Sequence, residues 1–164
     1  DIVVSAVTIT PERQKTMDFS APYFEAKQLI AVGSNSAVSK MADLKSKKVG
    51  VQTGTTGDEV VQKLQGKTSP NIKRFESTPL ALKELMNGGV EAVVVADNGV
   101  VVNFLANNKN IKLKTVDDSS FSKEYYGIAV KKGNKELLDK INKGLAAIKA
   151  DGTYQKIYKQ YFGN

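Results

Sequence analysis

Short β-branched runs alternate with helical stretches between residues 48 and 116, and this alternation constrains the fold more than any other feature of the sequence. We expect strands at residues 48–52, 72–76, 91–96 and 111–116. Between these strands we expect helices at residues 56–66, 79–86 and 98–107. The resulting order β-α-β-α-β-α-β is the signature of a doubly wound α/β lobe. The near-continuous apolar run at 91–96 is typical of a central strand in a parallel sheet that is covered on both faces.

The second of these helices carries start and stop signals. Thr78 is expected to be its N-cap and Pro79 its first residue, because proline lacks an N–H that would be unpaired at that position anyway. Asn87-Gly88-Gly89 is expected to end the helix.

The sequence on either side of this lobe predicts a second, discontinuous unit. A strand at 2–8, a turn around Pro11 and an extended stretch at 24–32 precede the lobe. A polar loop at 117–120, a strand at 126–130 and two helices follow it. We therefore expect one lobe at residues 28–118 and another made of residues 1–27 and 119–164, joined by two crossing strands. Lobes joined in this way can close around a ligand as a hinge.

Composition narrows the classes of function. The 164 residues include no cysteine and no histidine, which removes the thiolate nucleophile, the commonest general base and the commonest transition-metal ligands. We therefore expect no catalytic residues, no metal and no cofactor. The formal charge of +7 could indicate a nucleic-acid partner. The lysines are scattered, however, and those near the C-terminus alternate with a helical apolar stripe, so we expect solvated helix faces and no nucleic-acid partner. The stripe consists of Leu137, Leu138, Ile141, Leu145 and Ile148.

Ligands of open α/β sheets bind at the carboxyl ends of the strands. The run from Gln52 to Glu59 leaves a strand and enters a helix, where free backbone N–H groups and the hydroxyls of Thr55 and Thr56 could hold a carboxylate. The run is neither a P-loop nor a dinucleotide fingerprint. An ordinary threonine N-cap explains the segment equally well.

Two charged residues are further candidates. Asp97 follows the most apolar strand, where it can receive an ammonium group or simply cap the next helix. Arg13 follows the Thr10-Pro11 turn, and its guanidinium matches a carboxylate in shape and hydrogen bonding. An arginine at such a turn could also be an unremarkable surface residue, and neither position is decisive by itself.

Taken together, the motifs resemble the polar amino-acid-binding proteins of bacterial ABC importers, the extracytoplasmic solute-binding family, type 3. The likeness extends along essentially the whole chain and rests on the order and spacing of six segments: 1–13, 17–24, 49–56, 92–97, 126–130 and 152–158. It implies a periplasmic-binding-protein-like α/β fold with two lobes.

The resemblance also implies roles for particular residues. Arg13 closes the family's T-x-T-x-E-R motif and would clamp the ligand's α-carboxylate, with Thr56 completing that carboxylate site. Asp97 would receive the α-ammonium group. Residues of the adjoining segments would add hydroxyl, backbone and side-chain contacts; these are Ser5, Ala6, Thr8, Gln52 and Thr55.

The implied function is non-enzymatic binding of a free polar L-amino acid between the lobes, outside the cell membrane, for delivery to an ABC transporter permease. Family members begin with a further strand-helix-strand segment that nothing here resembles. The lobe formed by 1–27 and 119–164 is therefore expected to be incomplete, which would weaken binding or make it depend on a homo-oligomer.

Two other functions remain open. Some relatives are dehydratases of carboxylated cyclohexadienes, and such an enzyme would need a general acid near the motifs, where Glu12, Asp58 and Glu59 are the only carboxylates. The ligand-binding domain of a glutamate-receptor-like channel would need membrane spans, and no apolar run approaches the ~18 residues that a span requires.

Overall fold

The computed structural model describes residues 1–108 and 110–162, and the chain divides into two compact units. Unit 1 comprises Asp1–Glu25 and Glu124–Asn164, and unit 2 is the continuous stretch Ala26–Lys123. Strands β3 (Phe24–Lys27) and β9 (Lys123–Tyr126) pair with each other where the chain passes between the units. In the described residues no helix is long and apolar enough to cross a membrane.

Unit 2 is built on a five-stranded sheet with the order β6-β5-β7-β4-β8. Its strands are β4 (Leu29–Gly33), β5 (Val49–Gln52), β6 (Ile72–Phe75), β7 (Ala92–Val95) and β8 (Leu113–Val116). Strand β5 pairs in parallel with β6 and β7. Strand β4 is antiparallel to both β7 and β8. The α/β fold predicted from the alternating pattern is confirmed, but β4 lies inside the sheet, although the sequence indicated only an extended flank there.

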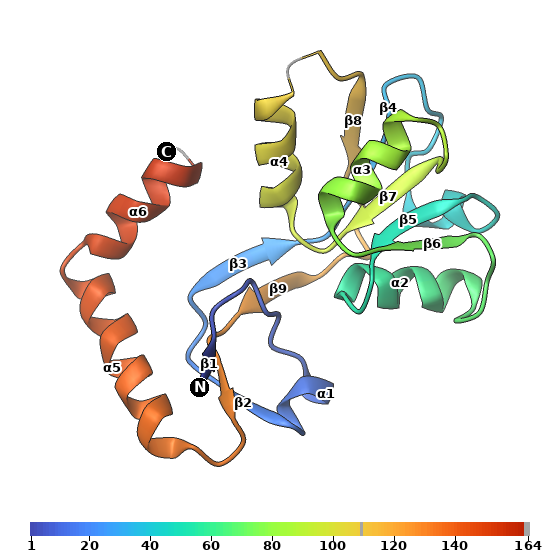
Figure 1. Ribbon diagram of the computed structural model, residues 1–164. Coiled ribbons are helices and arrows are strands. Elements are labelled where there is room, and N and C mark those ends of the chain that lie inside the picture. The colour runs from blue at the N-terminus through green and yellow to red at the C-terminus, as the bar shows by residue number, and fades with distance from the viewer. Residues whose placement is uncertain (109, 163–164) are drawn as a thin grey trace. The chain divides into compact units, whose positions relative to one another are not determined.

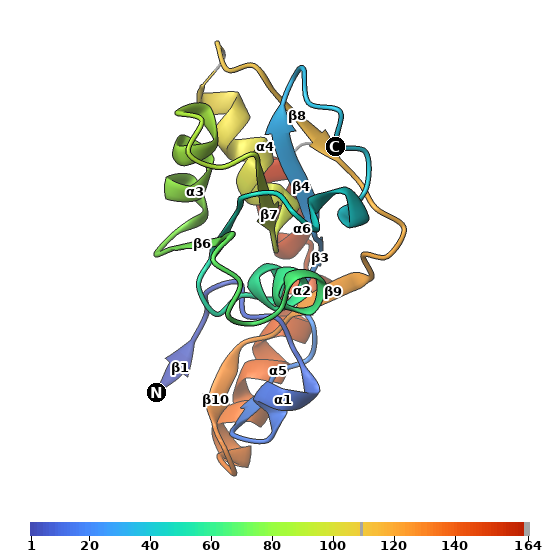
Figure 2. The same ribbon diagram turned by 90° about the vertical axis from the view of Figure 1, so that its right-hand side faces the viewer.

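Helices cover both faces of this sheet. Figures 1 and 2 show α3 (Thr78–Met86) and α4 (Asn98–Asn107) on one face, and α2 (Thr56–Gln65) on the other. The short 3-10 helix η1 (Met41–Leu44) packs on the same face as α2. Strand residues alternate between the two faces.

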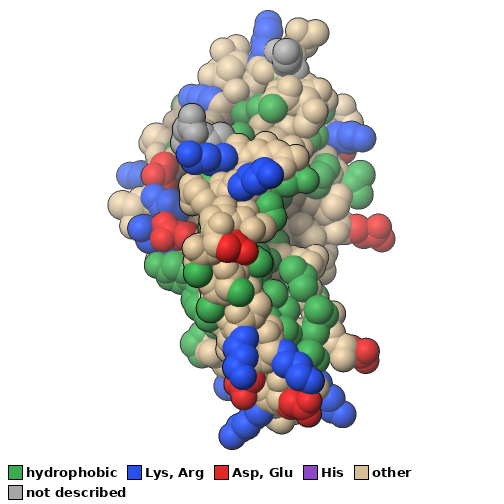
Figure 3. Space-filling model, turned by 90° about the vertical axis from the view of Figure 1, so that its left-hand side faces the viewer, with side chains coloured by type: hydrophobic (Ala, Val, Ile, Leu, Met, Phe, Trp, Pro, Cys, Tyr) green, Lys and Arg blue, Asp and Glu red, His purple; other side chains and the backbone are tan. Residues whose placement is uncertain are grey.

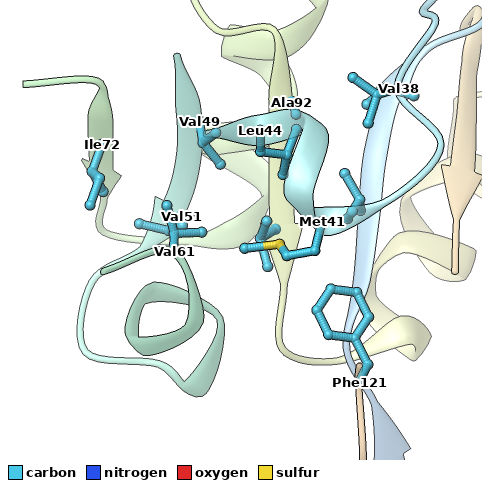
Figure 4. Close-up of a cluster of buried hydrophobic side chains, with 12 residues drawn as sticks. Val38, Met41, Leu44, Val49, Val51, Val61, Ile72, Ala92 and Phe121 are labelled. Carbon is cyan, nitrogen blue, oxygen red and sulfur yellow. The ribbon is translucent and has the colours of Figure 1, made fainter. Parts of the chain in front are cut away.

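The core of unit 2 follows from this alternation. On β7, Ala92 and Val94 join the cluster beneath α2 and η1, whereas Val93 and Val95 join the cluster beneath α3 and α4. Figure 4 shows the first cluster, in which Met41 points toward β7 from η1. All four residues of β7 are buried, as the apolar run predicted for a strand covered on both faces.

The helix boundaries are close to those predicted, with one correction. Ser77 is the N-cap of α3, because its side chain accepts the N–H of Leu80, so Thr78 is the first helical residue and Pro79 the second. Ser and Thr have similar capping chemistry, so the sequence alone did not separate two adjacent candidates. Helix α3 ends at Met86 with Asn87 as its C-cap, and Gly88 follows at a φ of +79°.

Unit 1 contains a three-stranded antiparallel sheet with the order β1-β10-β2. These strands are β1 (Ile2–Val3), β2 (Met17–Phe19) and β10 (Ala129–Lys131). Its helices are α1 (Pro11–Gln14), α5 (Lys135–Ala150) and α6 (Thr153–Phe162). The two helices predicted at the C-terminal end are confirmed.

Two predicted strands of unit 1 are interrupted. The strand expected at 2–8 ends at Val3, and Ala6 has a φ of +49°, a left-handed conformation that a strand cannot contain. The strand expected at 126–130 is divided between β9 and β10. Gly127 lies between them, and a Cβ at that position would come within 2.9 Å of Ile9 Cδ1.

The two amphipathic helices of unit 1, α5 and α6, are little buried by the rest of the chain. Neither α5 nor α6 contains a buried residue, although the apolar stripe of α5 is half-buried. Tyr161 and Phe162 are exposed by 72% and 50%. Figure 3, which views the side that carries these helices, shows hydrophobic side chains exposed between charged ones.

Candidate functional site

Two loops at the carboxyl end of the unit 2 sheet bring the predicted polar residues together. The β5–α2 loop (residues 53–55) follows Gln52, and Asp97 follows β7. Because β5 and β7 are parallel neighbours, with Val49 beside Ala92, the segments that leave them emerge at the same edge of the sheet.

The β5–α2 loop is closed by hydrogen bonds. Thr55 is the N-cap of α2: its hydroxyl donates to the carbonyl oxygen of Gln52 at 2.8 Å and accepts the N–H of Asp58 at 3.3 Å. Asp58 Oδ2 in turn accepts the N–H of Gly54 at 3.2 Å. Gly54 has a φ of +71°, a conformation that favours glycine. These hydrogen bonds within the chain give the loop a defined shape.

Gly57 fixes the start of α2 against β7. A Cβ at this position would lie 3.0 Å from the carbonyl oxygen of Val94 and 3.3 Å from the nitrogen of Ala96. Only glycine permits so close an approach without a shift of the backbone. The first turn of α2, with Thr56, is thereby held beside the segment that carries Asp97.

Asp97 caps α4, as the simpler of its two interpretations predicted. Its Oδ1 accepts the N–H of Gly99 at 2.7 Å. Within residues 1–108 and 110–162, the other carboxylate oxygen, Oδ2, has no hydrogen-bond partner. Capping therefore leaves one oxygen that can accept a hydrogen bond from a ligand.

Gln52 has a structural role that its position in the sequence did not indicate. Its Oε1 accepts hydrogen bonds from the backbone N–H of Thr78 at 3.3 Å and from the Thr78 hydroxyl at 3.0 Å. A backbone N–H can only donate, which identifies the facing amide atom as oxygen. The remaining group of Gln52 is its NH₂, a donor.

In unit 1, Arg13 and Thr8 are in contact. The Arg13 side chain donates from Nη1 to the carbonyl oxygen of Thr8 at 2.9 Å, and Arg13 lies in α1, which is capped by the Thr10 hydroxyl. Thr8 is only 5% exposed, and its hydroxyl donates to Glu124 at 2.9 Å. Ser5 and Ala6 are exposed in the preceding bend.

The buried Asp58 forms an ion pair with Arg74, a partly exposed residue, and the sequence did not indicate this pair. Asp58 is 2% exposed, and Arg74 Nε donates to its two oxygens at 3.1 and 3.2 Å. Burial raises the pKa of Asp58, but hydrogen bonds from Gln62, Arg74 and Gly54 outweigh it and hold the pKa below its usual value. An acidic residue at a helix start is ordinarily solvated. Only the parallel pairing of Val51 with Arg74 could have indicated this partner.

The charges of these groups favour a ligand that carries both an anionic and a cationic group. The start of α2 presents the positive end of a helix dipole, which favours an anion, and Asp97 offers an acceptor for a cation. Over the described part of the chain there is no group of three acidic residues that could hold a metal ion.

Comparison with known proteins agrees with this chemistry. Residues 1–164 match the family described as bacterial extracellular solute-binding proteins, family 3. A probable histidine-binding protein of Neisseria gonorrhoeae is 47% identical over 99% of this chain, and the ABC transporter arginine-binding protein 1 of Escherichia coli K12 is 39% identical over 99%. The structure of ArtJ, an arginine-, lysine- and histidine-binding protein of Geobacillus stearothermophilus, is 46% identical and superposes with a TM-score of 0.94 over 100% of this chain.

The chain spans 60% and 66% of the lengths of the Neisseria and E. coli proteins, and 70% of the ArtJ chain. These three relatives are named as binding proteins and not as enzymes. The match over all 164 residues nevertheless assigns the family: this chain belongs to the bacterial extracellular solute-binding proteins, family 3.

Proposed function

We propose that this protein binds a free polar L-amino acid through its α-carboxylate and α-ammonium groups. The observation that carries the proposal is the position of Gly57 against β7, which holds the hydroxyl-bearing start of α2 beside Asp97. In this arrangement Thr55 and Thr56 face the carboxylate, and the second oxygen of Asp97 accepts from the ammonium group.

Arg13 is proposed to complete the carboxylate site from unit 1. Its contact with the carbonyl oxygen of Thr8 supports this role, because it orients the guanidinium, a planar group that matches a carboxylate in shape and hydrogen bonding. Ser5, Ala6 and Thr8 are proposed to line the ligand beside Arg13. The left-handed conformation of Ala6 supports this assignment, because strained residues concentrate at functional sites.

Gln52 is proposed to contact the ligand's side chain through its NH₂ group. Because Thr78 holds the amide oxygen, Gln52 would act as a donor and would favour a side chain that carries an acceptor. The names of the relatives make histidine and arginine the first amino acids to test.

The proposed physiological role is delivery of the amino acid to the permease of an ABC importer, outside the cell membrane. The E. coli relative, an ABC transporter arginine-binding protein, supports this role. The two chain crossings at β3 and β9 support a hinge whose closure responds to ligand.

We also propose that the protein binds ligand most strongly as an assembly with a second copy of itself through unit 1. The support is the lack of any buried residue in α5 or α6 despite their apolar sides, together with the exposure of Ile2 and Val3 on β1, which is an edge strand. A solution mass equal to one chain at micromolar concentration would contradict this part of the proposal.

A dehydratase-like activity is disfavoured by the carboxylates near the motifs. Glu12 is exposed and pairs with Lys15, and the pKa of Asp58 is lowered by its hydrogen bonds, which outweigh the effect of burial. Asp58 is therefore not suited to donate a proton as a general acid near neutral pH. Turnover of a carboxylated cyclohexadiene would overturn this conclusion.

The binding proposal is tested by calorimetric titration of the 164-residue chain with the standard amino acids. Micromolar affinity, which corresponds to about −8 kcal/mol, is the expected result for at least one polar amino acid. Arg13→Ala and Asp97→Ala should each abolish that heat. An unchanged titration for either variant would remove that residue from the site.

A further inference from the structure

Asp58 places a negative charge close to the site proposed for the ligand's carboxylate. It lies in the first turn of α2, three residues after Thr55, and its side chain is 3% exposed. A carboxylate at a helix start is stabilised by the helix dipole. A buried carboxylate whose charge is not neutralised, however, also repels a second carboxylate that binds nearby.

Arg74 supplies the neutralising charge from a neighbouring strand. It lies on β6, beside Val51 of β5, and its Nε contacts both carboxylate oxygens of Asp58. Its Nη2 also donates to the carbonyl oxygen of Lys67 at 3.3 Å, which orients the guanidinium. The charge of Asp58 is therefore balanced from the side of β6.

The other contact of Asp58 reaches the β5–α2 loop itself. Oδ2 of Asp58 accepts the N–H of Gly54, while the Asp58 N–H donates to Thr55. This reciprocal arrangement is a variant of the capping box, in which the side chain reaches one residue further back. Gly54, Asp58 and Arg74 thus form a continuous chain of contacts behind the loop.

We propose that Asp58 and Arg74 are positioning residues for amino-acid binding. Asp58 holds the β5–α2 loop in its binding conformation through Gly54, and Arg74 cancels the charge that Asp58 would otherwise present to the ligand's α-carboxylate. This inference rests on the proposed function, because it assigns the loop to the carboxylate.

The first test needs no ligand. Asp58→Ala should accelerate amide hydrogen exchange at Gly54, measured by NMR on the 164-residue chain, by about tenfold relative to the amides of β5, since it removes a charge-assisted hydrogen bond. The matched control is Asp43→Ala, which removes a carboxylate that accepts the backbone N–H groups of Ser39 and Lys40. This control should leave Gly54 unchanged. Equal exchange at Gly54 in Asp58→Ala and the native chain would overturn the role of Asp58.

The second test separates charge balance from simple structural support. Arg74→Met should weaken the calorimetric Kd for L-arginine or L-histidine about tenfold, because it leaves the buried carboxylate unpaired. Arg74→Lys, which keeps the charge, should retain most of the affinity, and the double variant Asp58→Asn with Arg74→Met should recover it.

Other outcomes of the second test decide against charge balance. Equal losses in Arg74→Lys and Arg74→Met, or a double variant no better than Arg74→Met, would overturn it. If the native chain binds no amino acid, the proposed function fails for this chain, and the exchange at Gly54 alone then decides whether Asp58 positions the loop.

Discussion

Gly57 and Val94 are in such close contact that a Cβ on residue 57 would approach the Val94 carbonyl oxygen to 3.0 Å. Gly57→Ala should therefore push α2 away from β7 and separate Thr56 from Asp97. Helix propensity favours alanine, but the clash should outweigh it and lower the free energy of unfolding by about 1 to 3 kcal/mol. Urea denaturation and calorimetric titration measure the two effects.

The control for this substitution is Gly144→Ala in α5. Apart from its chain neighbours and the backbone of its own helix, no described atom lies within 4 Å of a Cβ at Gly144, so the same exchange should stabilise the protein by about 0.5 to 1 kcal/mol. If Gly57→Ala were as stabilising as Gly144→Ala and bound ligand normally, close packing against Val94 would have no part in shaping the site.

Substitutions at Asp97 can separate its capping of α4 from its proposed pairing with the ligand's ammonium group. Asparagine caps helices about as well as aspartate, so Asp97→Asn should change the free energy of unfolding by less than about 0.5 kcal/mol. It should nevertheless weaken amino-acid binding at least about tenfold, because it removes the charge that pairs with the ammonium group. Thermal unfolding and calorimetry on Asp97→Asn and Asp97→Ala distinguish the two roles. Normal binding by Asp97→Asn would leave only the cap.

Replacing the amide of Gln52 by a carboxylate should change which amino acid the protein prefers. In Gln52→Glu the carboxylate can still accept both hydrogen bonds from Thr78, so the contact between residue 52 and the start of α3 should persist. The donor of Gln52 becomes an acceptor, and the ratio of the Kd values for L-glutamine and L-arginine should shift about tenfold toward arginine. An unchanged ratio with intact stability would show that Gln52 supports α3 and does not contact the ligand's side chain.

Asp58 should contribute to the acid sensitivity of folding. The pKa of Asp58 is lowered in the folded chain by hydrogen bonds from Gln62, Arg74 and Gly54, which together outweigh the upward effect of burial. Its contribution to stability is therefore present above the unfolded-state pKa of about 3.9 and is lost as the pH falls through the lower folded-state value.

The corresponding variant is Asp58→Asn. Its free energy of unfolding should fall less steeply than that of the native chain as the pH is lowered below about 4. Other carboxylates with lowered pKa values, such as Asp18 and Glu91, act equally in both proteins and cancel in the comparison. Parallel stability curves would contradict the pairing of Asp58 with Arg74.

Local patterns predicted much of unit 2. The apolar run at 91–96 indicated a strand buried on both faces, and all residues of β7 are buried. The helix expected at 98–107 is observed with those bounds. Such features depend on nearest neighbours along the chain, where hydrophobic periodicity and capping chemistry are decisive.

Long-range pairing accounts for what the sequence did not reveal. Nothing local to residues 29–33 indicates that β4 lies between β7 and β8, because strand order depends on contacts far apart in the chain. The partner of Asp58 was missed for the same reason. Thr55, Thr56 and Asp97 were found as candidates because they follow strands, but their closeness depends on Gly57, which no motif singled out.

The position of β4 between β7 and β8 has a further consequence. Unit 2 is one uninterrupted segment, and its first and last sheet strands are neighbours, with Ile30 paired to Val116. Its two ends therefore leave the sheet side by side, which is the geometry that tolerates insertion and circular permutation. We expect residues 26–123 to tolerate grafting by their adjoining ends into a surface loop of an unrelated protein, and the graft would carry Thr55, Thr56 and Asp97, the unit 2 part of the proposed site, with it.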